Sequence, residues 1–232
     1  MALENTSSGA SWLLPDDEGS RKLAFILCLP LFDGVFATLL VTGAVNTFSQ
    51  MINVAVTVFA GAGAIAVLYS ESEGRREAIQ MINSVLPIVV SGALVIALVA
   101  PIFETVFQTS LLKYAAALAV GSIALQLADI RFAENFPPTA IIATGLVLSF
   151  QGINNLGLTL AYLAPALITV GIAVAGLYTA TYLKKYSMNL DYIRYGGSAV
   201  LLIISLSLFG VKIPSLAGPL VFGTSIFLSI KA

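Results

Sequence analysis

The chain has 232 residues, of which 58% are hydrophobic and only 10% are charged. A soluble globular domain carries about 25% charged residues, so this composition excludes that class. The net charge of −1 provides no electrostatic footprint for nucleic acid. The chain has no histidine and one cysteine, Cys28, which excludes an internal disulfide and argues against thiolate or imidazole metal ligands. We expect no metal and no cofactor.

Apolar stretches of about 18–25 residues alternate with short charged segments, and a helix of that length crosses roughly 30 Å of hydrocarbon. In lipid, backbone polar groups must be satisfied within their own segment, which favours helices. We therefore predict an all-α, polytopic transmembrane helix bundle of about eight helices in the plasma membrane, with the lipid bilayer as its main partner. The predicted spans are 23–45, 51–70, 81–103, 110–129, 138–151, 158–183, 193–210 and 213–230.

The distribution of lysine and arginine predicts how the bundle is oriented. Residues 1–22 are mostly polar and are expected to form a flexible cytoplasmic tail. With eight spans, the side opposite the tail carries only Lys113 and Lys212. The positive-inside rule therefore predicts that both termini are cytoplasmic. The basic residues predicted on the cytoplasmic side are Arg21, Lys22, Arg75, Arg76, Arg131, Lys184, Lys185, Arg194 and Lys231.

The two halves of the chain resemble each other. VFATLLV at 35–41 aligns with IIATGLV at 141–147, and the tyrosines of AVLYS and AGLYT each precede a basic loop. We predict two similar four-helix repeats, 23–130 and 131–232, with a site at their interface as in many transporters. The alternative is that apolar segments resemble each other through composition alone.

Asp33 is the strongest candidate for a functional residue. It lies near the middle of the first predicted span, where a carboxylate costs about 2.5–3.5 kcal/mol and needs a partner, water or a proton. Pro30 removes a backbone donor and Gly34 follows directly, so this segment can open the helix and expose carbonyls to an ion. The alternative is a structural aspartate that is hydrogen-bonded to a neighbouring helix.

Four further polar residues are weaker candidates for the same site. Thr139 aligns with Asp33 in the second half, and Thr144 follows on the same predicted helix. The commoner use of such threonines is a hydrogen bond to the preceding helical turn. Asn53 and Gln126 are candidates to line a polar path, although interhelical hydrogen bonds are the commoner use. The small residues at 60–64 favour close helix packing.

The sequence lacks the combinations of residues that enzyme active sites use. Glu104 and Lys113 flank the turn after the third span and are expected to form a pair at the rim. No lysine lies at the centre of a span, which argues against a retinal Schiff base. Catalytic triads, Cys-His pairs and acidic metal clusters are absent from the sequence, so we do not expect an enzyme.

The segments LCLPLFDGVFATLLVTGAV, VTVFAGAGAIAVL and MNLDYIRYGGSAVL together resemble an uncharacterised family of haloarchaeal multi-pass membrane proteins. This resemblance covers most of the chain after the tail, and it implies an archaeal plasma-membrane protein without an established activity. A fainter similarity links Asp33 to the first-helix acid of the lysine-exporter and cation-exchanger superfamily. The Glu-x-Gly-Asp-Lys pattern of the cation exchangers is missing, and the predicted four-plus-four layout departs from their inverted three-plus-three.

Two functions follow from these features. The first is a secondary transporter or exporter of a small solute or cation, in which Asp33 responds to protons or ions. The second is a non-transporting scaffold or accessory subunit of a membrane complex, in which Asp33 is structural or binds a partner. Both functions allow a homo-oligomer or a membrane-complex partner.

Overall fold

The fold was obtained as a computed structural model that describes residue 15 and residues 17–152, 159–184, 189–214 and 216–231. These residues form ten α-helices, one π-helix and one 3-10 helix, with no β-strand among them, so the all-α prediction is confirmed for the described chain. The elements are α1 (Glu18–Phe32), α2 (Val35–Val41), α3 (Phe48–Val54), η1 (Ala55–Phe59), α4 (Ala62–Ser70), α5 (Arg75–Val106), α6 (Thr109–Leu127), η2 (Arg131–Asn135), α7 (Pro138–Ser149), α8 (Leu163–Leu183), α9 (Leu190–Leu208) and α10 (Ala217–Lys231).

The first helix begins earlier than its hydrophobic run. Most of the predicted tail, 1–22, lies outside the described residues, but its last five residues belong to α1. The Asp17 carboxylate accepts a hydrogen bond of 2.7 Å from the Ser20 N–H. Burial raises the pKa of Asp17, but the hydrogen bonds from Ser20 outweigh it and hold the pKa below its ordinary value. A capping residue therefore sets the start of this helix.

The first two predicted spans are each divided into two helices. The first bends by 45° at Asp33–Gly34, between α1 and α2, and the second bends by 47° at Ala60–Gly61, between η1 and α4. The sequence predicts the opening at Asp33, but it does not predict the break at Gly61. Each of the remaining six predicted spans overlaps one helix, from α5 to α10.

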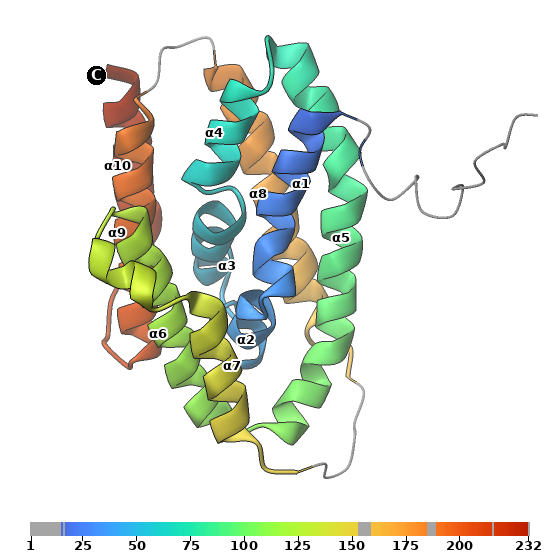
Figure 1. The fold of residues 1–232 in the computed structure, drawn as a ribbon, viewed down its shortest axis with the longest axis vertical. Helices are drawn as coiled ribbons and strands as arrows, with labels where there is room; N and C mark the ends of the chain where they lie inside the picture. Colours follow the sequence, from blue (N-terminus) through green and yellow to red (C-terminus); the bar gives the residue numbers. More distant parts are fainter. Residues whose placement is uncertain (1–14, 16, 153–158, 185–188, 215, 232) are drawn as a thin grey trace, which may run out of the picture.

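The helices pack as a bundle around α3 and α4, which lie at its centre in Figure 1. The α1 helix begins and the α10 helix ends at the same end of the bundle. The most extensive helix pairs are α6–α9, α9–α10, α6–α7, α5–α8 and α1–α5. The ends of α5 and α7 are also tied together, because the Gln151 N–H donates to the carbonyl of Val106 at 2.9 Å.

Serine and glycine hold α6 and α9 close together. The Ser198 hydroxyl donates to the carbonyl of Ala124 and the Ser205 hydroxyl donates to the carbonyl of Ala117, both at 2.8 Å. A Cβ added to Gly121 would lie 3.0 Å from Ser205 Oγ, so the missing side chain permits this approach. Small residues and interhelical hydrogen bonds of this kind are typical of helix pairs in membranes.

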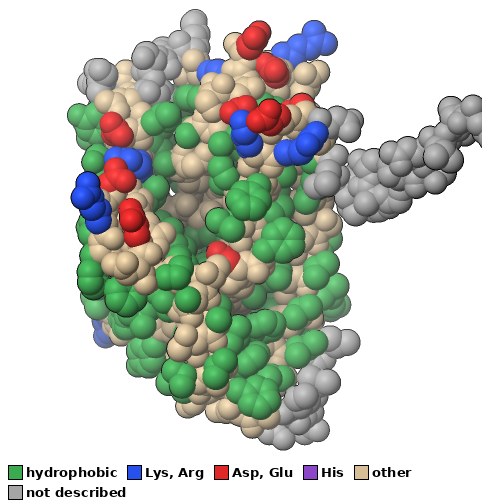
Figure 2. Space-filling model, viewed as in Figure 1, with side chains coloured by type: hydrophobic (Ala, Val, Ile, Leu, Met, Phe, Trp, Pro, Cys, Tyr) green, Lys and Arg blue, Asp and Glu red, His purple; other side chains and the backbone are tan. Residues whose placement is uncertain are grey.

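The surface of the bundle is largely apolar. Three helices, α5, α6 and α8, are long and apolar enough to cross a membrane, and five spans result if each bent pair is one span. In the most apolar stretch of α5 and of α8 only 33% of the residues are buried, so most of the residues there are at least partly exposed. Figure 2 shows charged side chains gathered in the upper half of one face, with apolar side chains below. Such a surface is compatible with a membrane protein.

A lysine and a tyrosine tie the ends of α4 and α8 together. The Lys184 ammonium donates to the carbonyl of Tyr69 at 3.2 Å and to the Ser72 hydroxyl at 2.6 Å, and it also donates to the Ser72 carbonyl. In return, the Tyr69 hydroxyl donates to the carbonyl of Ala180 at 2.9 Å. Burial lowers the pKa of Lys184 from its ordinary value. Each helix therefore supplies a donor to the C-terminal carbonyls of the other.

We expect Lys184→Met to lower the free energy of unfolding by about 1 kcal/mol, because it removes a charged donor from carbonyls that the fold has partly desolvated. The measurement is the midpoint of thermal unfolding in detergent. The matched control is Lys212→Met, because the Lys212 side chain is exposed and has no ion pair among the described residues. Equal midpoints for the two variants would contradict a stabilising role for Lys184.

Candidate functional site

The break between α1 and α2 is organised by Asp33. Its N–H ends α1 by donating to the carbonyl of Leu29 at 3.0 Å, and its Oδ1 accepts from the N–H of Val35, the first residue of α2, at 2.9 Å. Gly34 has a φ of +79°, which favours glycine. The Thr38 hydroxyl donates to the carbonyl of Gly34 at 2.8 Å. The carboxylate therefore binds the first backbone N–H of α2 from the position before its N-cap, Gly34, and these bonds satisfy polar groups that the break exposes.

Three of the predicted site residues share this break. Pro30 is buried inside α1, and without an N–H it cannot donate the helical hydrogen bond to the carbonyl of Ile26. Gly34 faces α7, where a Cβ would lie 3.5 Å from Cγ2 of Ile142. The structure thus brings Pro30, Asp33 and Gly34 together, as their sequence spacing requires.

The second break follows a stretch of π-helix. The Ala60 N–H donates to the carbonyl of Ala55 at 2.8 Å, five residues earlier, and the chain then becomes extended at Gly61. A Cβ on Gly61 would lie 2.5 Å from the carbonyl oxygen of Thr57. The Thr57 hydroxyl donates to the carbonyl of Asn53 at 2.6 Å. Single-turn π-helices of this kind are frequent at functional sites.

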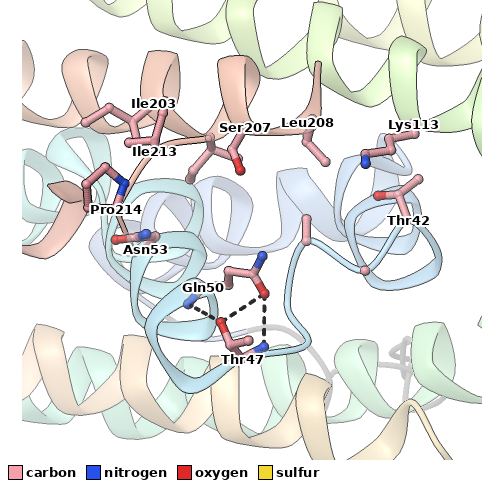
Figure 3. Close-up of a pocket in the computed structure, with 13 residues that line it drawn as sticks. Thr42, Thr47, Gln50, Asn53, Lys113, Ile203, Ser207, Leu208, Ile213 and Pro214 are labelled. Carbon is pink, nitrogen blue, oxygen red and sulfur yellow. Dashed lines mark hydrogen bonds between the residues drawn. The ribbon is translucent and has the colours of Figure 1, made fainter. Parts of the chain in front are cut away.

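A polar cavity of about 250 Å³ lies beside Asn53 (Figure 3). Its walls come from the connection between α2 and α3, from α3 and α6, from the end of α9 and from the segment before α10. Asn53 is 8% exposed, and its Oδ1 has no hydrogen-bond partner among the described residues. An unsatisfied buried polar atom costs about 1–3 kcal/mol, so it needs an explanation. The polar residues that line the cavity are Thr42, Thr47, Gln50, Asn53, Lys113 and Ser207.

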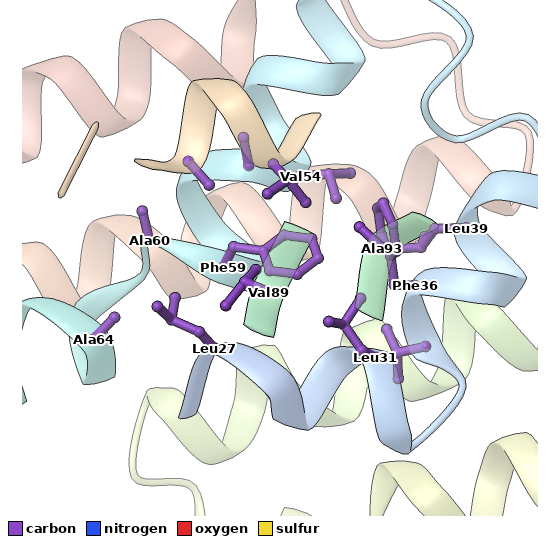
Figure 4. Packing of buried hydrophobic residues seen from close by; sticks show 14 of the residues in the cluster. Leu27, Leu31, Phe36, Leu39, Val54, Phe59, Ala60, Ala64, Val89 and Ala93 are labelled. Atoms are coloured by element: carbon purple, nitrogen blue, oxygen red, sulfur yellow. The ribbon is translucent and has the colours of Figure 1, made fainter. Parts of the chain in front are cut away.

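An apolar core joins the two breaks (Figure 4). Phe36 of α2 and Phe59 of η1 are fully buried and meet edge to face, with ring centroids 4.9 Å apart. Leu31 of α1 and Val89 of α5 belong to the same cluster. Phe36 follows Asp33 by three residues and Phe59 precedes Gly61 by two, so this contact joins the segments next to the two breaks.

Gln126 is placed away from both the breaks and the cavity. Its Nε2 donates to the carbonyl of Ala133 at 3.0 Å and to the Ser122 hydroxyl at 3.2 Å. The Ser122 hydroxyl in turn donates to the carbonyl of Phe136. These bonds hold η2 against the end of α6, so the side chain stabilises a turn.

The two threonines lie on the exposed face of α7. The Thr144 hydroxyl donates to the carbonyl of Ala140 at 2.8 Å, one helical turn earlier. This is the back-bonding that we considered the commoner use of such threonines. Thr139 is exposed at the start of the helix. The structure does not bring either side chain to the polar cavity.

The position of Lys113 differs from the one predicted from the sequence. We expected it to pair with Glu104, but in the structure Glu104 accepts a hydrogen bond of 2.7 Å from the Tyr162 hydroxyl. Lys113 instead lines the polar cavity with Gln50. One feature of the sequence could have indicated this role: Lys113 is one of only two basic residues predicted on the non-cytoplasmic side.

The fold and site define an α-helical protein that is compatible with a membrane setting, with two broken helices and a polar cavity. Residues 89–209, more than half of the chain, match a family of unknown function (DUF5794), and the chain belongs to this family. No curated protein and no solved structure matches the chain. The matched segment contains Lys113 and Gln126 but neither Asp33 nor Asn53.

Proposed function

We propose that this protein is a secondary transporter or exporter of a small solute or cation. The observation that carries this proposal is the contact between two broken spans, with a carboxylate at the first break. Transporters use discontinuous helices because the break frees polar backbone groups inside the membrane to bind ions and solutes. Asp33 is the proton- or ion-responsive group.

The capping bond of Asp33 provides a coupling mechanism. The N-terminus of a helix carries a partial positive charge, which an ionised carboxylate stabilises. Protonation or ion binding neutralises Asp33 and weakens its hold on the Val35 N–H. The angle between α1 and α2 can then change, and the Phe36–Phe59 contact transmits this change to the second break. Such a switch between two packed states is what alternating access requires.

We place the protein in an archaeal plasma membrane as a multi-pass protein with cytoplasmic termini. The cytoplasmic termini are supported by nine basic residues on one predicted side against two on the other, and by the common end at which α1 begins and α10 ends (Figure 1). The archaeal source is supported by the resemblance of the sequence alone. The repeats over 23–130 and 131–232 stay a prediction from the sequence. If the halves are duplicated, the cavity lies between them, because Asn53 belongs to the first and Ser207 to the second.

Flux measurements with Asp33→Asn test the transport proposal. The purified full chain is placed in liposomes that contain a pH-sensitive dye, and gradients of Na⁺, K⁺ and Ca²⁺ are imposed. We expect proton movement in the wild type and at least a tenfold lower rate in Asp33→Asn, because the amide cannot carry the charge. The matched control is Asp129→Asn, because the Asp129 side chain is 73% exposed and asparagine accepts its φ of +62°. Equal flux in Asp33→Asn and the wild type would contradict the role of Asp33.

The second candidate function is a non-transporting scaffold or accessory subunit. The observation in its favour is that the capping bond to Val35 already gives Asp33 a structural use. Asparagine caps helices about as well as aspartate, whereas alanine costs about 1 kcal/mol. A scaffold therefore predicts normal stability for Asp33→Asn, a lower unfolding midpoint for Asp33→Ala, and no flux in the wild type.

A further inference from the structure

The polar cavity contains a lysine that has no ion pair with the residues described by the structure. Lys113 lies in the second turn of α6 and is partly buried. Its ammonium has no ion pair or hydrogen bond with any described residue, and of the thirteen described residues that line the cavity it alone carries a charge. A partly desolvated ammonium without a counter-ion favours binding of an anion.

Two side-chain amides offer further donors to the same space. Gln50 Oε1 accepts hydrogen bonds of 3.0 Å from both the N–H and the hydroxyl of Thr47. This capping box fixes the amide, and its nitrogen points across the cavity toward Ser207 (Figure 3). The Oδ1 of Asn53 has no hydrogen-bond partner among the described residues, and Figure 3 shows this side chain at the opposite end of the cavity from Lys113.

The carboxamide of Asn53 packs against α10 at Gly218. A Cβ on Gly218 would lie 2.3 Å from Asn53 Oδ1 and 2.9 Å from its Nδ2, so the bare glycine leaves just enough room for the carboxamide. The side chain is 8% exposed and therefore cannot reach bulk water for its hydrogen bonds. The unbonded oxygen of Asn53 is an acceptor, so a hydroxyl or N–H group on the body of a ligand suits it, whereas a carboxylate does not.

The volume of the cavity and the residues that line it limit the class of ligand that fits. The cavity of about 250 Å³ holds roughly eight waters at about 30 Å³ each, which suits a small organic molecule. Ile203, Leu208 and Ile213 line it beside the polar groups, so an apolar body is accommodated. One lysine balances one negative charge, whereas phosphate recognition usually draws on several cations or an arginine fork.

We propose that this cavity binds a small organic monocarboxylate, whose carboxylate pairs with Lys113 while the amides of Gln50 and Asn53, farther along the cavity, face its polar body. As the substrate class of the transporter this inference rests on the proposed function, although binding can be measured without flux. The cavity lies at the end of the bundle opposite the start of α1 and the end of α10, so in the proposed topology the ligand is bound from the non-cytoplasmic side.

Calorimetric binding of lactate to the full chain in lipid nanodiscs tests the inference, with acetate, chloride and phosphate as further probes. We expect saturable binding of lactate and acetate and at least a tenfold weaker affinity for chloride and phosphate. Lys113→Gln should lower lactate affinity at least tenfold, and Lys113→Arg, which keeps the charge, should retain more of it. The matched control Lys212→Gln alters a lysine near the same end that does not line the cavity, and it should bind as the wild type does.

A second pair of variants tests the site without touching its charge. Gly218→Ala should weaken lactate binding by displacing the Asn53 amide, whereas Gly223→Ala in the same helix should not, because no atom lies within 4 Å of its added Cβ. Unchanged lactate affinity in Lys113→Gln, equal binding of all four anions, or no carboxylate binding by the wild type would overturn the inference. Binding without flux would remove only the transport proposal, and flux without carboxylate binding would remove only this inference.

Discussion

Gly61→Ala is expected to lower the free energy of unfolding by about 1–3 kcal/mol, the cost typical of overpacking. The added Cβ would lie 2.5 Å from the carbonyl oxygen of Thr57, and a backbone atom cannot rotate out of the way. The π-helical turn that ends at Phe59 must shift, and Phe59 then moves against Phe36. The effect therefore reaches the packed core between the two breaks.

Gly63→Ala provides the matched control, because it adds the same methyl group two residues further along. Its Cβ would lie 3.7 Å from Cγ2 of Ile26, an ordinary van der Waals contact. We expect an unfolding midpoint near or above that of the wild type, since alanine favours the helix. The measurement is the loss of the monodisperse peak in size-exclusion chromatography after heating. If both variants lose it at the same temperature, the second break is not sterically required.

Local sequence signals were enough to place most helices and one of the two breaks. Pro30, Asp33 and Gly34 lie within five positions, so the opening between α1 and α2 can be anticipated from their chemistry alone. The break at Gly61 could not be anticipated. The small residues at 60–64 equally suit close packing of a continuous helix, and the requirement for glycine arises from the Thr57 carbonyl in the folded chain.

The cavity was harder to predict because its parts are distant in sequence. Asn53 was identified as a polar residue inside a span, but its neighbours in the cavity, Lys113 and Ser207, come from α6 and α9. Lys113 was assigned to Glu104 because both flank one turn, yet Tyr162, 58 residues from Glu104, takes that bond. Sequence proximity predicts pairing only where the backbone holds both side chains on one face.

The hydrogen bond between Asp33 and Val35 is compatible with both roles that the sequence left open for Asp33, a structural one and a proton- or ion-responsive one. The carboxylate bond to the Val35 N–H is structural, and it weakens when the carboxyl is protonated, whereas asparagine keeps an amide oxygen that accepts the same bond but cannot titrate. The same bond can therefore stabilise one bend angle when ionised and release it when neutral. Stability of Asp33→Asn together with loss of flux would demonstrate both uses in one variant.

Gly145→Ala is expected to separate α6 from α7 and to lower the free energy of unfolding by about 1–3 kcal/mol. The added Cβ would lie 2.2 Å from the Cβ of Ala115, and an alanine methyl has no other rotamer to adopt. Gly145 is buried, and the α6–α7 pair is among the most extensive in the bundle. Since α7 also faces Gly34 at the first break, the displaced helix would loosen the contact between Gly34 and Ile142.

The matched control for this variant is Gly171→Ala in α8, where the glycine is exposed and an added Cβ meets no atom within 4 Å. Alanine there should leave the unfolding midpoint unchanged or raise it, through helix propensity worth up to about 1 kcal/mol. Size-exclusion chromatography after heating measures the thermal stability of both variants in the same way. If Gly145→Ala were as stable as Gly171→Ala, α7 would not need this close approach to α6. The position of Ile142 over the Asp33–Gly34 break would then not depend on helix packing.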